Sequence, residues 1–123
     1  MAWKGIVFFL IFTFAAQANN FNIKQIYKFN NPWGSSFISD DEIIITEKSG
    51  KIKLINLISN SVSEINHNLK ILEDGQGGLL DILFKDSNVW VTYSQDHGKL
   101  KSTTSIAKGK FDRDKINFKN IFI

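Results

Sequence analysis

The sequence predicts an all-β fold built from two similar sets of antiparallel strands. β-Branched and aromatic residues gather in short runs, and several runs alternate polar and apolar side chains as half-buried strands do. Turn-forming residues separate these runs, and beyond residue 18 no segment has the apolar period of an amphipathic helix. The expected strands cover residues 33–38, 42–47, 51–56 and 62–65 in the first set, and 79–84, 89–94, 103–111 and 116–123 in the second.

Turn signals bound the strands of the first set. Pro32 is the only proline in the chain, and because it has no N–H to donate it belongs at the start of the first strand. Ser49-Gly50 predicts the hairpin between the second and third strands, and Asn60-Ser61 predicts the next turn. These signals indicate a meander of four strands.

The second set repeats this plan. A polar turn at 85–88 and a polar loop at 95–101 separate its strands, and residues 112–114, Asp-Arg-Asp, turn the chain into the last one. Strand quartets that recur about every 45 residues are typical of β-propeller blades. An ordinary antiparallel meander with accidental periodicity fits the pattern equally well, so the residues alone leave both architectures open.

The first residues have the form of a secretory signal peptide. A positively charged start precedes the apolar residues 5–14, and residues 16–18, Ala-Gln-Ala, fit the small-x-small cleavage pattern. The apolar stretch is too short to span a bilayer comfortably. We therefore expect residues 1–18 to be removed and residues 19–123 to lie in the periplasm or outside the cell, with an uncleaved membrane anchor as the alternative.

The composition argues against several classes of function. The chain has no cysteine, so its stability must come from its own core instead of disulfides. The formal net charge is only +3, and the lysines are scattered among Asp, Glu and Asn, so nucleic acid is not an expected partner. The chain also has no metal-ligand spacing, phosphate-binding loop or nucleophile–base arrangement.

The most distinctive stretch is residues 74–81, Asp-Gly-Gln-Gly-Gly-Leu-Leu-Asp. Glycine allows a positive φ and the close approach of another surface. Gln76, between the glycines, carries one carbonyl acceptor and two N–H donors. This pattern predicts a tight loop that aims one amide outward and leads into a buried strand. The alternative role of Gln76 is to cap the loop by bonding the local backbone.

Five short motifs follow one another along the chain: Asn-Pro-Trp-Gly at 31–34, Ile-Thr-Glu-Lys-Ser-Gly-Lys-Ile at 45–52, the glycine-rich loop at 74–81, Val-Thr-Tyr-Ser at 91–94, and the strand at 103–110. In this order they resemble the opening part of the soluble aldose sugar dehydrogenases that depend on pyrroloquinoline quinone (PQQ), in the glucose/sorbosone dehydrogenase family. The resemblance implies a secreted bacterial six-bladed β-propeller. This chain would supply about its first two four-stranded blades, as an N-terminal fragment of a longer enzyme.

The resemblance also implies a reaction and a site. Family members oxidise the anomeric hydroxyl of an aldose to a lactone; PQQ takes the hydride, calcium helps to hold the quinone, and a separate electron acceptor reoxidises it. The glutamine of the family's glycine-rich loop contacts the quinone, which makes Gln76 the cofactor-binding residue expected here. The family's catalytic histidine and calcium ligands would follow Ile123. We therefore expect no catalytic and no metal-binding residue in this chain, and no activity of the fragment alone.

Four other residues invite a functional interpretation. His97 lies in Asp-His-Gly-Lys-Leu, which superficially resembles the catalytic segment, but its loop is variable in the family and we do not assign it as the base. We expect His67 to be a solvated loop residue, Glu47 to form a structural ion pair or a solvated face, and Trp33 to be a core or channel-lining aromatic. The alternative functions are a secreted β-propeller binding module without redox activity, because blades serve many functions, and a decayed gene product that never folds.

Overall fold

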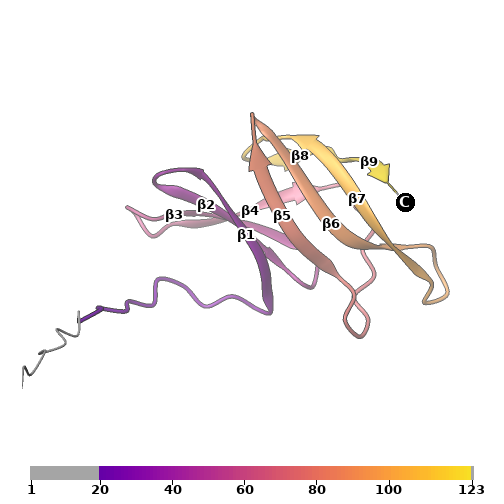
Figure 1. Cartoon of the computed structure of the whole chain (residues 1–123), viewed down its shortest axis with the longest axis horizontal. Helices are drawn as coiled ribbons and strands as arrows, with labels where there is room; N and C mark the ends of the chain where they lie inside the picture. Colours follow the sequence, from indigo (N-terminus) through magenta and orange to yellow (C-terminus); the bar gives the residue numbers. More distant parts are fainter. Residues whose placement is uncertain (1–19, 123) are drawn as a thin grey trace, which may run out of the picture.

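The computed structural model describes residues 20–122, which form two β-sheets without a helix (Figure 1). The strands of these residues are β1 (Pro32–Ser39), β2 (Glu42–Glu47), β3 (Lys51–Asn56), β4 (Val62–His67), β5 (Leu79–Lys85), β6 (Asn88–Asp96), β7 (Ser102–Lys110), β8 (Lys115–Ile116) and β9 (Lys119–Phe122). The first sheet has the order β1-β2-β3-β4-β8 and the second the order β5-β6-β7-β9. Within this range no helix is long and apolar enough to cross a membrane.

Seven of the eight expected strands are confirmed, with ends that differ by at most two residues. Their hairpins also occur where the turn residues predict them: Gly50 and Asn60 both have positive φ, 107° and 57°. The local pattern was sufficient here because a turn residue and an alternating run are both short-range signals. The expected signal peptide, residues 1–18, lies outside the described residues.

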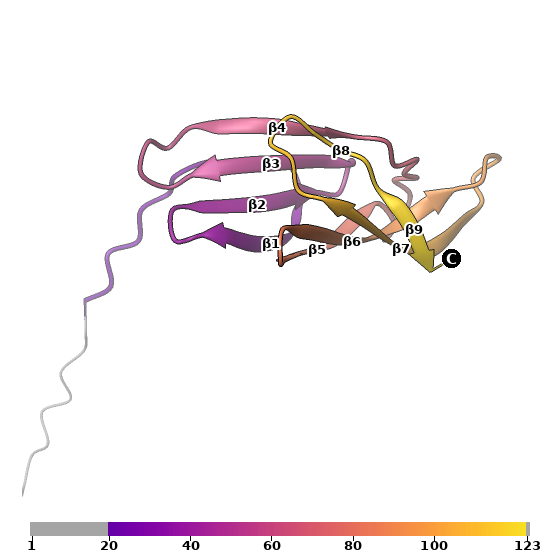
Figure 2. The same cartoon turned by 90° about the horizontal axis from the view of Figure 1, so that it is seen from above.

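The expected last strand, 116–123, is wrong as a single strand, since only residues 119–122, β9, join the second sheet. In its place, β8 pairs in parallel with β4 of the first sheet, and β9 pairs with β7 of the second. Between them the side chain of Asn68 interrupts the strand, because it accepts the Phe118 N–H at 2.7 Å and donates to the Phe118 carbonyl at 3.0 Å. Figure 2 shows the C-terminal segment crossing from one sheet to the other, so it ties the two sheets together.

The core lies between the sheets and draws on both. β1 and β5 lie side by side at their junction. The apolar side chains buried there come from β2, β3 and β4 on one side and from β5, β6 and β7 on the other; the largest that are fully buried are Tyr93, Ile44, Ile52, Ile65, Leu79, Ile116, Val89 and Val91. Ile116 of β8 is completely buried, which explains why this short strand joins the first sheet.

Both inner strands, β1 and β5, are bulged, and a threonine hydroxyl fills each bulge in the same way. Thr46 accepts the Gly34 N–H at 2.9 Å, and Thr92 accepts the Asp81 N–H at 3.1 Å. The Thr46 hydroxyl also donates to the Leu80 carbonyl of the second sheet at 2.5 Å. Gly34 permits this approach, because a Cβ there would lie 2.6 Å from the Asp81 carboxylate. The two sheets are therefore structural repeats that meet along their bulged inner strands.

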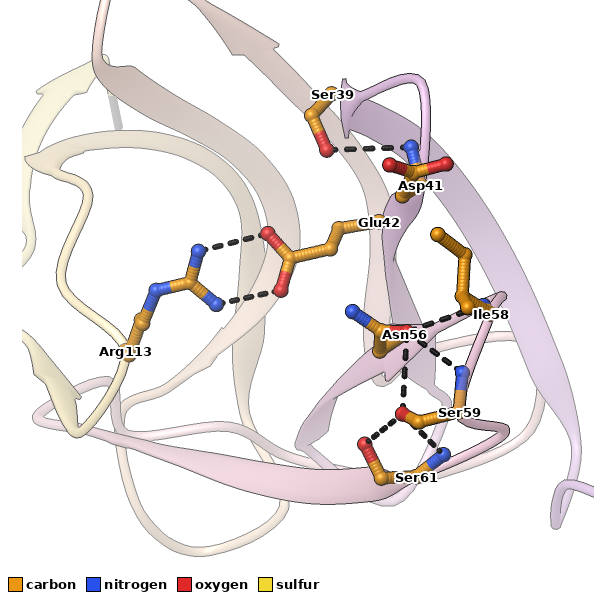
Figure 3. Close-up of polar contacts among 8 residues, drawn as sticks. All are labelled: Ser39, Asp41, Glu42, Asn56, Ile58, Ser59, Ser61 and Arg113. Atoms are coloured by element: carbon orange, nitrogen blue, oxygen red, sulfur yellow. Dashed lines mark hydrogen bonds and ion pairs between the residues drawn. The ribbon is translucent and has the colours of Figure 1, made fainter.

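An ion pair between Arg113 and Glu42 also links the two sheets. Arg113, in the turn after β7, donates through Nη1 and Nη2 to the two carboxylate oxygens of Glu42 at 2.6 and 2.7 Å (Figure 3). The hydrogen bonds from Arg113 lower the pKa of the Glu42 carboxyl. In the neighbouring turn the Asn56 side chain accepts the N–H groups of Ile58 and Ser59, which closes the loop before β4 (Figure 3).

Candidate functional site

The glycine-rich loop lies at the entry to β5, the inner strand of the second sheet. Gly75 and Gly78 have φ values of 53° and 152°, which favour glycine, and the Gly77 N–H donates to the Asp74 carbonyl at 2.7 Å to close the loop. The side chain of Gln76 is at the exposed tip. The expected geometry, a tight turn followed by a buried strand, is confirmed in this part of the chain.

Two flanking residues hold the loop on opposite sides. On one side Lys48, which follows β2, accepts the Leu79 N–H at 3.0 Å through its backbone carbonyl. On the other side Ser94 of β6 donates its N–H to the Gly78 carbonyl at 2.8 Å, and its hydroxyl accepts the Gly78 N–H at 3.2 Å. A Cβ on Gly77 would lie 2.7 Å from the Ser94 hydroxyl. Glycine is needed at 77 and 78 because the Ser94 side chain lies close to Gly77 and the Lys48 backbone lies close to Gly78.

The amide of Gln76 is not used to build the loop. Among residues 20–122 no hydrogen bond involves the Gln76 side chain, and the backbone bond from Gly77 to Asp74 closes the turn. The exposed amide therefore keeps its one acceptor and its two donors for another molecule. The same described part of the chain contains no cluster of three or more His, Cys, Asp or Glu side chains that could hold a metal ion.

Two sequence expectations near the loop are wrong. Among residues 20–122 the Glu47 side chain forms neither an ion pair nor a solvated face: the residue is only 5% exposed, and its carboxylate accepts the Asn30 N–H at 2.7 Å. His67 is not a solvated loop residue: it ends β4, its Nδ1 accepts the Leu69 N–H at 3.2 Å, and its Nε2 lies 2.5 Å from the Gly50 carbonyl. Since Nδ1 accepts, Nε2 is the nitrogen that donates. Both side chains therefore form hydrogen bonds with the backbone of neighbouring segments.

The other two candidate residues lie away from the core. Trp33 of β1 is 51% exposed, so within the described residues it is not a core aromatic, and its role as a channel-lining aromatic stays a prediction. His97 lies in the loop between β6 and β7, as expected, and its ring nitrogen is 2.8 Å from the Thr103 hydroxyl. Nothing in this arrangement makes either residue part of the glycine-rich loop.

A cleft of about 330 Å³ lies elsewhere, where the segment after β4 passes β6 and β9. Its floor is a neutral cluster of side-chain hydrogen bonds: the Tyr93 hydroxyl donates to Oδ1 of Asn120 at 2.6 Å, and Nδ2 of Asn120 donates to Oε1 of Gln95 at 2.8 Å. Burial raises the pKa of the Tyr93 hydroxyl. Because these groups bond one another, they attach β9 to β6 within the second sheet rather than form a reactive site.

The residues that sequence reasoning missed are Lys48 and Ser94. Each sits at the end of a recognisable strand, but its contact with the loop joins positions 16 to 31 residues apart: Lys48 with Leu79, and Ser94 with Gly78. A local pattern cannot reveal such a contact. The usable signal was the run of glycines at 77 and 78, which indicates that another chain segment lies close by.

Comparison with known proteins finds a matching family model and a related protein. A family model described as glucose/sorbosone dehydrogenase matches residues 29–123. An uncharacterized protein of Synechocystis sp. is 28% identical over 116 residues, which cover 81% of this chain and 28% of that protein.

Three solved structures share the arrangement of strands. A glucose dehydrogenase superposes with a TM-score of 0.68 at 24% identity, over 76% of this chain and 30% of its own. The apo soluble aldose sugar dehydrogenase of Escherichia coli gives 0.67 at 23% identity, over 76% and 29%. The PQQ-bound aldose sugar dehydrogenase of Streptomyces coelicolor gives 0.67 at 17% identity, over 77% and 30%.

The matches confirm the expected fold class: the two sheets are two blades of a β-propeller. The chain spans only about three-tenths of the length of the relatives it matches. In these terms the glycine-rich loop connects the first blade to the inner strand of the second.

Proposed function

Because this chain belongs to the glucose/sorbosone dehydrogenase family, we propose that it forms the first two blades of a PQQ-dependent sugar dehydrogenase. Residues 1–18 act as its signal peptide, and residues 19–123 begin its propeller domain. The complete enzyme oxidises the anomeric hydroxyl of an aldose to a lactone. The observation that carries the proposal is the exposed Gln76 amide on a loop that both neighbouring strands hold in place.

The groups at the loop fit a quinone. A quinone presents carbonyl oxygens, which accept hydrogen bonds from amide N–H groups, and the Gln76 amide has two of them. PQQ supplies the hydride-accepting chemistry when it is bound. The role of Gln76 is to bind and orient that ring. The loop can do so with little loss of freedom, because its backbone is already ordered by Lys48 and Ser94.

The proposal places the remaining chemistry beyond this chain. As the family resemblance implies, calcium and the catalytic base belong to later blades of the complete enzyme. The form of residues 1–18 supports a location in the periplasm or outside the cell. There the enzyme passes electrons to a separate acceptor.

Two measurements test this function. The first reads the coding sequence beyond Ile123 in all frames. A His-Gly-Gly-Arg-like segment and further blades support the proposal, whereas a stop with nothing related downstream overturns dehydrogenase activity for this product. The second loads the complete protein with PQQ and calcium and follows dye reduction by aldoses.

A matched pair of variants tests the residue. Loss of one good hydrogen bond to the quinone should weaken the affinity of Gln76→Ala for PQQ about tenfold. Gln25→Ala, which changes an exposed glutamine before β1, should bind PQQ as the wild type does. Equal affinities in the two variants would sink the role of Gln76. A folded wild type that does not bind PQQ at all would favour the binding-module alternative.

A further inference from the structure

Lys48 belongs to the first blade, yet its contacts lie on both sides of the glycine-rich loop of the second. We infer that Lys48 is a positioning residue that fixes the conformation of the Gln76 loop. The inference rests on the proposed function only where it gives Gln76 a quinone to bind.

The backbone of Lys48 is held at both of its polar atoms. Its N–H donates to the Asn31 carbonyl at 3.0 Å, just before β1, and its carbonyl accepts the Leu79 N–H at 3.0 Å, at the first residue of β5. Lys48 therefore has a defined place between the inner strands of the two blades. A side chain that starts from such a point can hold a neighbour in place.

The side chain then crosses the loop from its exit to its tip. Its stem lies against Gly78, where an added Cβ would be 2.7 Å from the Lys48 Cγ. Its ammonium group donates to the carbonyl of Gly75 at 2.5 Å. Gly75 directly precedes Gln76, so the lysine contacts the loop next to the residue whose amide must be aimed.

The tip of the loop has few other supports. Nothing lies within 4 Å of a Cβ built on Gly75, whereas Gly77 and Gly78 are in close contact with Ser94 and Lys48. The base of the loop is thus held by backbone bonds that any residue at 48 could make. At the tip, the ammonium bond to Gly75 and the bond between Gly77 and Asp74 are the contacts that set its direction. Since Lys48 is half-buried, its stem has already lost much of the freedom that weakens most surface lysine contacts.

The test compares four forms of the full chain: wild type, Lys48→Met, Lys48→Arg and the control Lys85→Met. Methionine keeps the length of the stem and removes the charge, and Lys85 is an exposed lysine at the far end of β5. Amide hydrogen exchange in the loop and the nuclear magnetic resonance shift of the Gln76 side-chain amide report the conformation directly, without any cofactor. Thermal unfolding reports global stability, and Lys48→Gln replaces Lys48→Met if the latter does not fold.

For the loss of one charged hydrogen bond we expect about fivefold faster exchange at Gly77 and Gly78 in Lys48→Met, with a shifted Gln76 amide signal. Lys48→Arg, which can still donate to Gly75, should restore both readouts, and Lys85→Met should not change them. Wild-type exchange and an unshifted amide in Lys48→Met overturn the inference. Faster exchange with unchanged PQQ affinity supports Lys48 as the positioning residue and instead overturns cofactor binding by Gln76, so the two failures are distinguishable.

Discussion

Replacing Thr46 with valine removes one buried hydroxyl and leaves the size of the side chain almost unchanged. Thr46 is completely buried, and its hydroxyl accepts the Gly34 N–H at 2.9 Å and donates to the Leu80 carbonyl at 2.5 Å. Both backbone groups lie at strand bulges, where the sheet register shifts. Thr46→Val therefore leaves one donor and one acceptor without a partner at the junction of the blades.

The magnitude follows from the cost of unsatisfied groups. Each buried polar group that loses its partner costs about 1–3 kcal/mol, so the variant, which leaves two such groups, should lose about 2–6 kcal/mol of unfolding free energy. A small domain has a total stability of only about 5–15 kcal/mol. For a domain of this size the loss corresponds to a fall in Tm of about 10 °C or more.

The assay is denaturant unfolding followed by the fluorescence of Trp33 and Trp90, with Tm measured in parallel. Thr104→Val is the matched control, because Thr104 is an exposed threonine of β7. An exposed substitution of this kind should stay within about 0.5 kcal/mol of the wild type. If Thr46→Val were as stable as Thr104→Val, the hydroxyl would not link the blades in solution, and the account of the bulges would be refuted.

Two further predictions concern the loop and the ion pair. Gly78→Ala should destabilise the protein by about 1–3 kcal/mol in denaturant unfolding, because φ at Gly78 is 152° and the new Cβ would clash with Lys48. Gly75→Ala is the control and should cost less, because there is open space around a Cβ at that position. Equal losses in the two variants would contradict the close packing at Gly78. The Arg113 hydrogen bonds lower the pKa of Glu42, so their contribution to stability is present above the ordinary value of 4.5 and is lost as the pH falls below it toward the lowered value. The gap in denaturant midpoint between wild type and Glu42→Gln should therefore be wider at pH 7 than at pH 3, and a gap independent of pH would contradict the assigned pair.

The strands could be predicted because their signals are local. The alternation in residues 51–56, and the Ser49-Gly50 turn before it, depend on neighbours in the chain, and the structure places both as expected. The last segment could not be predicted in the same way. Its apolar alternation is real, but the division into β8 and β9 depends on Asn68, whose side chain reaches Phe118 from 50 residues away.

The site shows the same division between local and distant causes. The positive φ values at Gly75 and Gly78 could be inferred from the glycines themselves. The burial of Glu47 could not, since its partner is the backbone of Asn30 in a segment without regular structure. For Lys48 the deciding contact is with Gly75, which is 27 residues further along the chain. The charged residues were therefore the least predictable part of the site, because a carboxylate or an ammonium group can be either solvated or hydrogen-bonded to a distant part of the backbone.

Thr46 and Thr92 occupy equivalent positions in the two blades, but only Thr46 also bonds to the neighbouring blade. The Thr46 hydroxyl donates a hydrogen bond to the Leu80 carbonyl of the second blade, and its oxygen accepts the Gly34 N–H at the bulge of its own blade. Thr92 accepts the Asp81 N–H at the bulge of the second blade in the same way, and within residues 20–122 its hydroxyl donates to no carbonyl. The second blade is thus completed by its own threonine and joined to the first blade by Thr46. Because neighbouring repeats stabilise one another through their interfaces, the loss of Thr46 should affect both the bulge of its own blade and the junction with the blade that follows.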